Sequence, residues 1–257
     1  MDIRTKLRIK TASKAAFIHL LLSSGIALFA ALLVFTLWYP YPYAELSGGR
    51  ELFILVVLVD VVCGPLLTMV LFTPEKSHQV LRRDLFFIAL LQLLALGYGL
   101  MSVWQARPLF LVAEVDRFKV IAGTQLPENF VNELPGALQP HWLAGPRVVA
   151  IREPLNDKER ETVLLDASQG GRDYAERPEF YLPYEREMRN KTTRRAKPLT
   201  FFLKKVPSQL ADAKKLAISK SSDIAQLLYL PVVGRQDWVA VLDKQGEIQG
   251  FLKGDGF

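Results

Sequence analysis

The chain has 257 residues, of which 50% are hydrophobic, and it carries a formal net charge of +6 with a single cysteine. The lone cysteine, Cys63, excludes an intrachain disulfide and a cysteine-rich zinc site. Charged residues are concentrated after residue 104, where 23 of the 32 Lys and Arg and 20 of the 26 Asp and Glu lie. Because these charges nearly balance, residues 105–257 have the composition of an ordinary soluble domain, which does not favour nucleic acid as a partner.

Three apolar windows precede residue 105. The first, residues 15–38, contains no Asp, Glu, Lys or Arg. At about 1.5 Å of rise per residue it is longer than the hydrocarbon core of a bilayer, which is roughly 30 Å thick. The other two windows cover residues 52–72 and 85–104. The sequence therefore predicts a basic N-terminal segment, residues 1–14, followed by a three-helix transmembrane domain over residues 15–104.

The basic start followed by an apolar run also fits a signal peptide. Signal peptides, however, have a shorter apolar core and a small-residue cleavage site. Here the run ends in the aromatic sequence that begins at Trp38 and Tyr39. Trp and Tyr are enriched at the membrane–water interface, so this ending favours a retained membrane anchor.

The basic residues predict the orientation of the three spans. The loop between the first two spans contains a single basic residue, Arg50. Basic residues mark the cytoplasmic side, so we expect the N-terminus and the second loop in the cytoplasm and the C-terminal domain outside. In a bacterium with two membranes, this makes a multi-pass protein of the inner membrane with a periplasmic domain. The residues that predict the cytoplasmic side are Arg4, Lys6, Arg8, Lys10, Lys14, Lys76, Arg82 and Arg83.

Residues 105–257 predict a small α+β domain. A hairpin closes the chain, with strands at residues 238–242 and 247–252 around a turn that contains Gly246. A helix is predicted over residues 208–230. The charge-rich, Gly- and Pro-rich residues 169–198 are read as loops with a possible helix at 183–190. The remaining strand predictions are residues 109–115, 118–121, 147–152 and 162–165.

Polar residues within the spans are the strongest candidates for a site. Asp60, Gly64 and Thr68 follow one another at i+4 spacing, with Pro65 beside them, and therefore share one side of a helix. The third span contains Gln92 and Tyr98. A carboxyl group inside a membrane is costly unless it is protonated, paired or facing protein. Two interpretations remain open: an internal hydrogen bond that locks the bundle, and a surface on which a foreign transmembrane helix docks.

His19 lies near the cytoplasmic end of the first span. By the rise of a helix it is too far in depth from Asp60 for a direct pair. We interpret it as an interfacial polar residue or, alternatively, as a contact for an acidic group on a partner helix.

A basic stretch in the C-terminal domain offers a second candidate surface. Such a stretch is usually a solvated loop, but it also suits an acidic partner or anionic lipid headgroups. Its residues are Arg189, Lys191, Arg194, Arg195 and Lys197.

Catalysis finds little support in the sequence. None of the HExxH, GxSxG and phosphate-binding GxxxxGK[ST] motifs is present, and each of these spacings serves a defined chemistry. The sequence predicts a non-enzymatic protein without a cofactor or a metal, whose partners are membrane lipids and another protein.

Several motifs in the membrane half resemble the type IV pilin accessory protein family. They are Trp38-Tyr39-Pro40, the string from Asp60 to Thr68, the segment from Arg83 to Gln92, Tyr98-Gly99 and Arg107-Pro108. The resemblance implies an inner-membrane chaperone or assembly modulator for a cognate type IV pilin. A pilin would then meet the polar residues of the spans with its transmembrane helix, and the exported domain with its head. The rival interpretation is a membrane-anchored sensor or scaffold that binds a ligand unrelated to pili.

Overall fold

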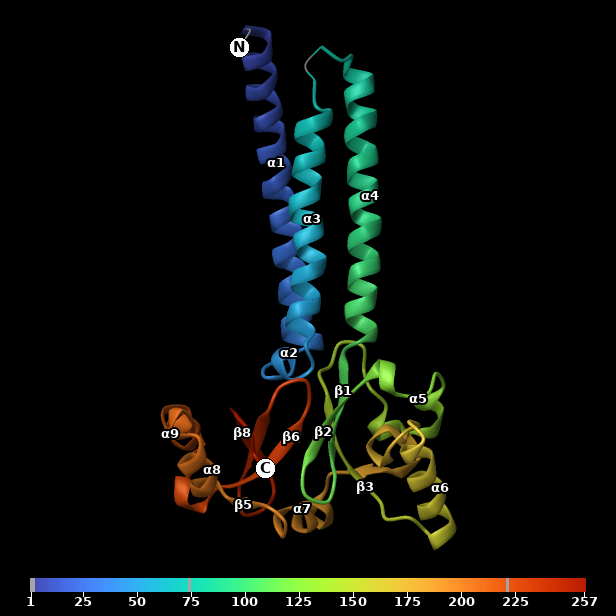
Figure 1. Ribbon diagram of the computed structural model, residues 1–257, viewed down its shortest axis with the longest axis vertical. Helices are drawn as coiled ribbons and strands as arrows, with labels where there is room; N and C mark the ends of the chain where they lie inside the picture. The colour runs from blue at the N-terminus through green and yellow to red at the C-terminus, as the bar shows by residue number, and fades with distance from the viewer. Residues whose placement is uncertain (1–2, 74, 221) are drawn as a thin grey trace. The chain divides into compact units, whose positions relative to one another are not determined.

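The computed structural model describes residues 3–73, 75–220 and 222–257, and it contains three long helices and one mixed sheet with flanking helices (Figure 1). The predicted fold class, a three-helix transmembrane bundle followed by an α+β domain, is confirmed. Contacts divide the chain into two compact units. The membrane unit comprises the chain up to Thr36 together with Gly49–Gln105. The sheet unit comprises Leu37–Gly48 and Ala106–Phe257.

Three helices form the membrane unit, and each is long and apolar enough to cross a bilayer. They are α1 (Ile3–Leu33), which continues as a π-helical turn over Val34–Trp38, α3 (Gly49–Leu71) and α4 (His78–Gln105). Helix α3 packs against both α1 and α4. Over the part of the chain that the structure describes, α1 and α4 share hardly any contacts with each other. The bundle is therefore organised around α3.

Small residues make the packing in this bundle close. The buried side of α1 consists mainly of Ala12, Ala16, Ser23, Ala27 and Ala30. On α4, a Cβ atom at Gly99 would overlap the side chain of Val56 on α3. Without a hydrophobic driving force between helices in lipid, such close backbone approach is the main source of helix association.

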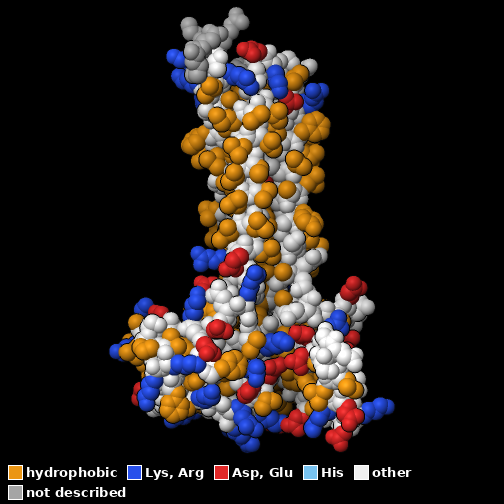
Figure 2. Space-filling model, in the orientation of Figure 1, with side chains coloured by type: hydrophobic (Ala, Val, Ile, Leu, Met, Phe, Trp, Pro, Cys, Tyr) orange, Lys and Arg blue, Asp and Glu red, His pale blue; other side chains and the backbone are white. Residues whose placement is uncertain are grey.

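Large apolar side chains of the membrane unit point outward. Phe29 on α1 is 71% exposed, and Phe17 and Leu94 are also exposed. Hydrophobic side chains cover the visible face of these helices in Figure 2, with Lys and Arg gathered at the end near the N-terminus. This distribution suits a surface surrounded by lipid rather than water.

The sheet unit is built on eight strands in the order β4-β3-β1-β2-β6-β7-β8, with β5 pairing with β6. The pairs β1/β3 and β2/β6 are parallel and the other pairs are antiparallel. Strand β1 is buried along its whole length. The strands are β1 (Pro108–Ala113), β2 (Phe118–Ala122), β3 (Arg147–Ile151), β4 (Tyr181–Pro183), β5 (Lys197–Pro198), β6 (Leu228–Val233), β7 (Trp238–Leu242) and β8 (Ile248–Lys253).

Short helices cover the sheet. Helices α8 and α9 pack with β6 and β7 around Phe202, and residues near α5 pack with β1 and β3 around Phe110. These helices are α5 (Phe130–Glu133), α6 (Asp157–Ser168), α7 (Arg186–Thr193), α8 (Leu199–Lys205) and α9 (Leu210–Ser219).

Residues 37–48, between the first two spans, are part of the sheet unit. Their short helix α2 (Tyr43–Leu46) buries Tyr43 and Leu46 in a core cluster with residues of β1, β2, β6 and β7. The Arg235 backbone N–H donates a hydrogen bond of 2.6 Å to the Leu46 carbonyl. Burial in this core raises the pKa of the Tyr43 phenol above its ordinary value. Part of the aromatic segment is therefore core, not an interfacial belt.

Two predictions for the sheet unit are wrong. Residues 162–165 lie in α6 rather than in a strand, because the Asn156 side chain caps the helix by accepting the Glu159 backbone N–H at 2.8 Å. The predicted helix over 208–230 is also too long: α9 ends at Ser219 and residues from 228 onward form β6. Pairing of β6 with β7 overrides the local helical pattern there.

Other predictions are close to the observed elements. The strands expected at residues 109–115, 118–121 and 147–152 correspond to β1, β2 and β3, and the closing hairpin is β7 and β8. Within residues 169–198, the possible helix corresponds to α7, shifted toward the C-terminus, and β4 and β5 are additional. Gly246 has a φ of +79° in the hairpin turn, a conformation that favours glycine.

Candidate partner-binding surfaces

The side of α3 that contains Asp60, Gly64 and Thr68 is buried inside the bundle. The Gln92 side chain of α4 donates from Nε2 to the Asp60 carbonyl oxygen at 2.9 Å and to the Asp60 carboxylate at 3.5 Å. The same side chain fills the space above Gly64, where a Cβ atom would overlap it. The internal contact between the second and third spans is thus present.

The Gln92 Oε1 atom is buried and has no hydrogen-bond partner among the described residues. Such an atom costs free energy in a low-dielectric interior. The contact with Asp60 therefore satisfies only part of the hydrogen-bonding capacity of this amide.

His19 joins the first span to the second. Its Nδ1 atom lies 2.5 Å from the Thr68 hydroxyl oxygen, and the Thr68 side chain is buried. The sequence does not specify this contact, because the two residues lie on different helices and are 49 positions apart. Asp60, Gly64 and Thr68 now account for contacts with both neighbouring helices, so the three residues position α1 and α4 around α3.

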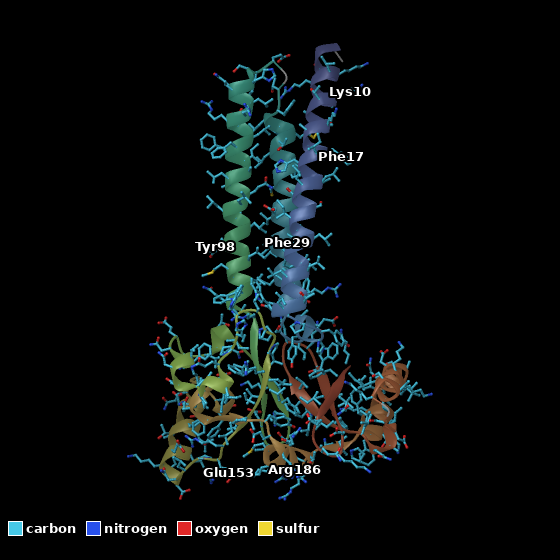
Figure 3. The ribbon with its side chains drawn as sticks, turned by 180° about the vertical axis from the view of Figure 1, so that it is seen from behind. Lys10, Phe17, Phe29, Tyr98, Glu153 and Arg186 are labelled. Carbon is cyan, nitrogen blue, oxygen red and sulfur yellow. The ribbon has the colours of Figure 1, made fainter. Side chains whose placement is uncertain are left out.

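Tyr98 behaves differently from the other predicted residues of the spans. It is 79% exposed on α4 (Figure 3), on the same side as three other exposed residues spaced by three or four positions. We call this set the α4 stripe; it consists of Phe87, Leu91, Leu94 and Tyr98. Nothing in the sequence distinguishes the apolar members from their lipid-facing neighbours. Pro65 lies inside α3 and is half-buried.

The basic stretch of the sheet unit is divided between paired and open residues. Arg189 forms an ion pair with Glu247 of the closing hairpin, and Lys191 lies 3.7 Å from Glu187. Within the described residues, Arg194, Arg195 and Lys197 are exposed and form no ion pair. Only the last three therefore offer charge to a partner without breaking an existing pair.

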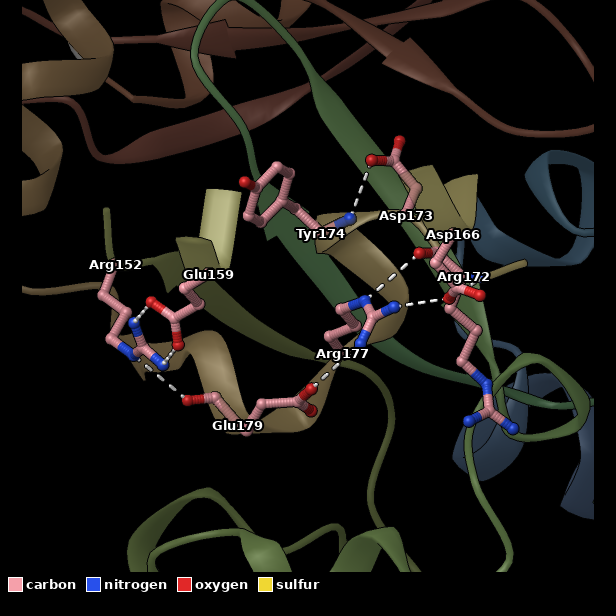
Figure 4. Close-up of polar contacts among 8 residues, drawn as sticks. All are labelled: Arg152, Glu159, Asp166, Arg172, Asp173, Tyr174, Arg177 and Glu179. Atoms are coloured by element: carbon pink, nitrogen blue, oxygen red, sulfur yellow. Dashed lines mark hydrogen bonds and ion pairs between the residues drawn. The ribbon is translucent and has the colours of Figure 1, made fainter. Parts of the chain in front are cut away.

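A separate ionic network holds α6 to its surroundings (Figure 4). The Arg152 guanidinium donates to both carboxylate oxygens of Glu159, at 3.0 and 2.8 Å. Together with the Leu155 backbone N–H, which donates at 2.6 Å, it lowers the pKa of Glu159 to about 2. Arg177 binds Asp166 at 2.5 Å and Glu179 at 3.4 Å. These pairs are internal and therefore suit a structural role.

The sheet unit also has a shallow cavity of about 200 Å³ beside α2. Lys119 and Arg235 lie on its wall, but Lys119 is already paired with Glu176 at 3.0 Å. Across the described residues, no group of three or more His, Cys, Asp or Glu side chains gathers in a way that suits a metal ion.

Comparison with known proteins connects these features to a family. Residues 7–48 match the family described as fimbrial assembly protein FimB. The fimbrial assembly proteins of serogroups I and E1 from Dichelobacter nodosus are each 34% identical to this chain over 260 residues, covering 98% of both sequences. A third protein of that organism, the fimbrial assembly protein of serogroups C1 and C2, is 38% identical over 132 residues, which is 51% of this chain and 98% of that protein. No solved structure matches the chain.

The similarity extends well beyond the membrane half, where the recognisable motifs lie. Identity of 34% across nearly the whole length includes the sheet unit as well as the spans. The chain therefore belongs to the family of fimbrial assembly proteins, the type IV pilin accessory family that its motifs resemble.

Proposed function

We propose that this chain acts in pilus assembly by holding an unassembled type IV pilin in the inner membrane until the subunit is used. The observation that carries the proposal is the full-length similarity to two fimbrial assembly proteins. The names of these relatives describe assembly rather than a reaction, which supports a non-enzymatic role. Binding would be chaperone-like, with one contact in the bilayer and one outside it.

The α4 stripe is the proposed contact for the pilin transmembrane helix. Phe87, Leu91, Leu94 and Tyr98 are all exposed, and residues at this spacing form a seam along one side of a helix. The phenol of Tyr98 would lack a hydrogen-bond partner in lipid, and a partner helix with a polar group supplies one. Binding of a pilin helix to the α4 stripe would therefore remove the unfavourable exposure of the Tyr98 phenol to lipid.

Asp60, Gly64, Pro65, Thr68, Gln92 and His19 are proposed to act on the same event by shaping the bundle. The contacts of Gln92 with Asp60 and Gly64 hold α4 against α3, and the contact between His19 and Thr68 holds α1 against α3. A substitution at Asp60 would then reduce pilin binding through the position of α4.

Exposed Arg194, Arg195 and Lys197 are the proposed contact for an acidic surface on the pilin head. This assignment requires the sheet unit to lie in the periplasm, where a membrane-held pilin presents its head. The predicted orientation, based on the basic residues around the first span and in the second loop, supports that location.

Site-specific photo-cross-linking tests the membrane contact. A benzophenone amino acid at position 98 should cross-link to pilin in intact cells, while the same group at position 29, an exposed site on α1, should not. Equal cross-linking at both positions, or at neither, would reject the α4 stripe. Asp60→Leu removes the carboxylate that Gln92 contacts and should weaken cross-linking at position 98 without loss of the folded protein.

Affinity capture from detergent-solubilised membranes tests the function itself. The wild-type chain should retain its cognate pilin, and Arg194→Glu with Arg195→Glu should retain less of it. A matched control is Lys214→Glu with Lys215→Glu, a pair of exposed lysines on α9. If no pilin is retained under any solubilising condition, the alternative of a sensor or scaffold unrelated to pili gains support.

Two reporter domains, each fused after Phe257, test the orientation of the chain in the membrane. A fused alkaline phosphatase, which is active only after export, should be active, and a fused green fluorescent protein, which fails to fold after export in unfolded form, should be dark. The opposite pattern would place the sheet unit in the cytoplasm.

A further inference from the structure

Trp142 and Leu143 form an apolar tip on a loop of the sheet unit. The Ala144 backbone N–H donates to the His141 carbonyl at 3.1 Å, which makes these two residues the central pair of a tight turn. Trp142 is 59% exposed and Leu143 is 40% exposed. Turn centres in water favour Pro, Gly, Asn, Asp or Ser. A Trp-Leu pair at such a position is unfavourable in water and suits an apolar or interfacial environment.

The tip is also fixed in shape. The Leu143 backbone N–H donates to Nδ1 of His141 at 3.2 Å. This second hydrogen bond adds to the backbone bond between Ala144 and His141 and stabilises the turn. The Trp142 side chain therefore projects from an ordered support, which lowers the entropic cost of inserting it elsewhere.

Contacts within the sheet unit place this tip at the end of the first span. The Trp38 indole N–H donates to the Trp142 carbonyl at 3.1 Å. The loop also approaches Pro40 so closely that a Cβ at Gly145 would lie 2.7 Å from its Cγ. Trp38 is the last residue of the first candidate span, and a Trp in that position is typical of the membrane–water interface. Trp142 is therefore in direct contact with the residue that ends this span.

The sequence around the tip contains no charge. Residues 134–146 include no Asp, Glu, Lys or Arg, although the sheet unit is otherwise rich in all four. A charged neighbour would have to be desolvated as the tip entered the headgroup region. The surroundings of the tip are thus compatible with shallow insertion.

We propose that Trp142 and Leu143 insert into the membrane–water interface, on the side of the bilayer where the sheet unit lies, and anchor the sheet unit to the lipid surface. The indole supplies an apolar body and one N–H donor, the combination that is stable at the level of the headgroups. The lipid contact is distinct from the pilin contacts proposed above and does not depend on them.

Depth-dependent quenching in the full-length protein tests the proposal. The protein is prepared with Cys63→Ala, given Leu143→Cys, labelled with an environment-sensitive fluorophore and placed in nanodiscs of phosphatidylethanolamine and phosphatidylglycerol. We expect a blue-shifted emission. A lipid with a nitroxide near the headgroup should quench this emission strongly, and a lipid with a nitroxide deep in the acyl chain should quench it only weakly. The matched control is Leu164→Cys, an exposed leucine on α6, which should respond to aqueous iodide instead.

A second measurement leaves position 143 unchanged. Brominated lipids quench tryptophan, so Trp142→Ser should lower the fraction of total tryptophan emission that they remove, with an unchanged circular dichroism spectrum as the control for folding. Iodide quenching at 143 equal to that at 164, with no effect of Trp142→Ser on bromolipid quenching, would overturn the proposal. Protection at 143 that arises only when purified pilin is added would also overturn it, because the tip would then bind protein.

Discussion

Phe29 in the membrane unit and Phe110 in the sheet unit are the same residue type in opposite surroundings. Phe29 is 71% exposed on α1, whereas Phe110 is fully buried in β1 with its ring centroid 5.1 Å from that of Tyr181. In the membrane unit many of the buried residues are small or polar, such as Ser23, Gly99 and Thr68. The sheet unit is held together by buried apolar area, whereas the membrane unit depends on close backbone approach and on a few hydrogen bonds.

The largest expected effect comes from making one substitution in both units. Phe110→Ala should destabilise the sheet unit by about 3–5 kcal/mol, because it leaves a cavity in a close-packed core. Phe29→Ala should change stability little, because lipid surrounds the side chain in the folded and the unfolded but inserted state. Thermal unfolding followed by circular dichroism in nanodiscs measures both. Comparable losses for the two variants would contradict the contrast between the units.

Two glycine substitutions in α4 test whether its close packing against α3 stabilises the membrane unit. Gly99→Val should push α4 away from Val56 and cost about 1–3 kcal/mol, the range typical of overpacking. Gly97→Val is the matched control, because nothing lies within 4 Å of a Cβ at that position. Resistance to unfolding by sodium dodecyl sulfate should fall for the first variant only. A similar loss for both would mean that helix propensity, rather than the contact with α3, sets the result.

A smaller effect is expected from the polar contact between α1 and α3. His19→Ala and Thr68→Val should each destabilise the bundle, with a coupling energy of about 0.6 kcal/mol in a double-mutant cycle, the average for hydrogen bonds between membrane helices. Thr36→Val serves as the control, because the Thr36 hydroxyl donates to the Leu32 carbonyl one turn earlier in the same span, at 2.5 Å. Zero coupling between positions 19 and 68 would show that the contact does not hold the helices.

The smallest expected effect is a pH dependence of the sheet unit. The folded-state pKa of Glu159, about 2, lies below the ordinary value of 4.5, so its ion pair stabilises the protein above pH 4.5 and this contribution is lost as the pH falls toward 2. Glu159→Gln should remove that part of the acid sensitivity. The melting temperature of both proteins between pH 7 and pH 3 measures it, with Glu161→Gln, an exposed residue of the same helix, as control. Parallel curves for wild type and Glu159→Gln would exclude the ion pair as a source.

The features that were predictable from the sequence are those with a local cause. Twenty or more consecutive apolar residues define a span without reference to any other segment, and the spacing of Asp60, Gly64 and Thr68 defines one side of a helix. The closing hairpin was equally local, since its strands are separated by a short turn.

The features that were missed depend on contacts distant in sequence. The parallel pairs β1/β3 and β2/β6 join strands with no short connection, so no local pattern specifies them. In residues 162–165, the short apolar run suited a strand and a helix equally, and the cap at Asn156 decided between them. Burial of Tyr43 was missed because the strands that form its core follow it by more than 60 residues.

The burial of α2 in the core of the sheet unit limits how many times the chain can cross the membrane between α2 and β1. Tyr43 and Leu46 share a core with β6 and β7, so residues 37–48 and the C-terminal domain must lie in the same aqueous compartment. The two helices between them in the chain, α3 and α4, must then cross the bilayer together or not at all. A chain in which only one of them inserted would leave the two parts of a single hydrophobic core on opposite sides of the membrane.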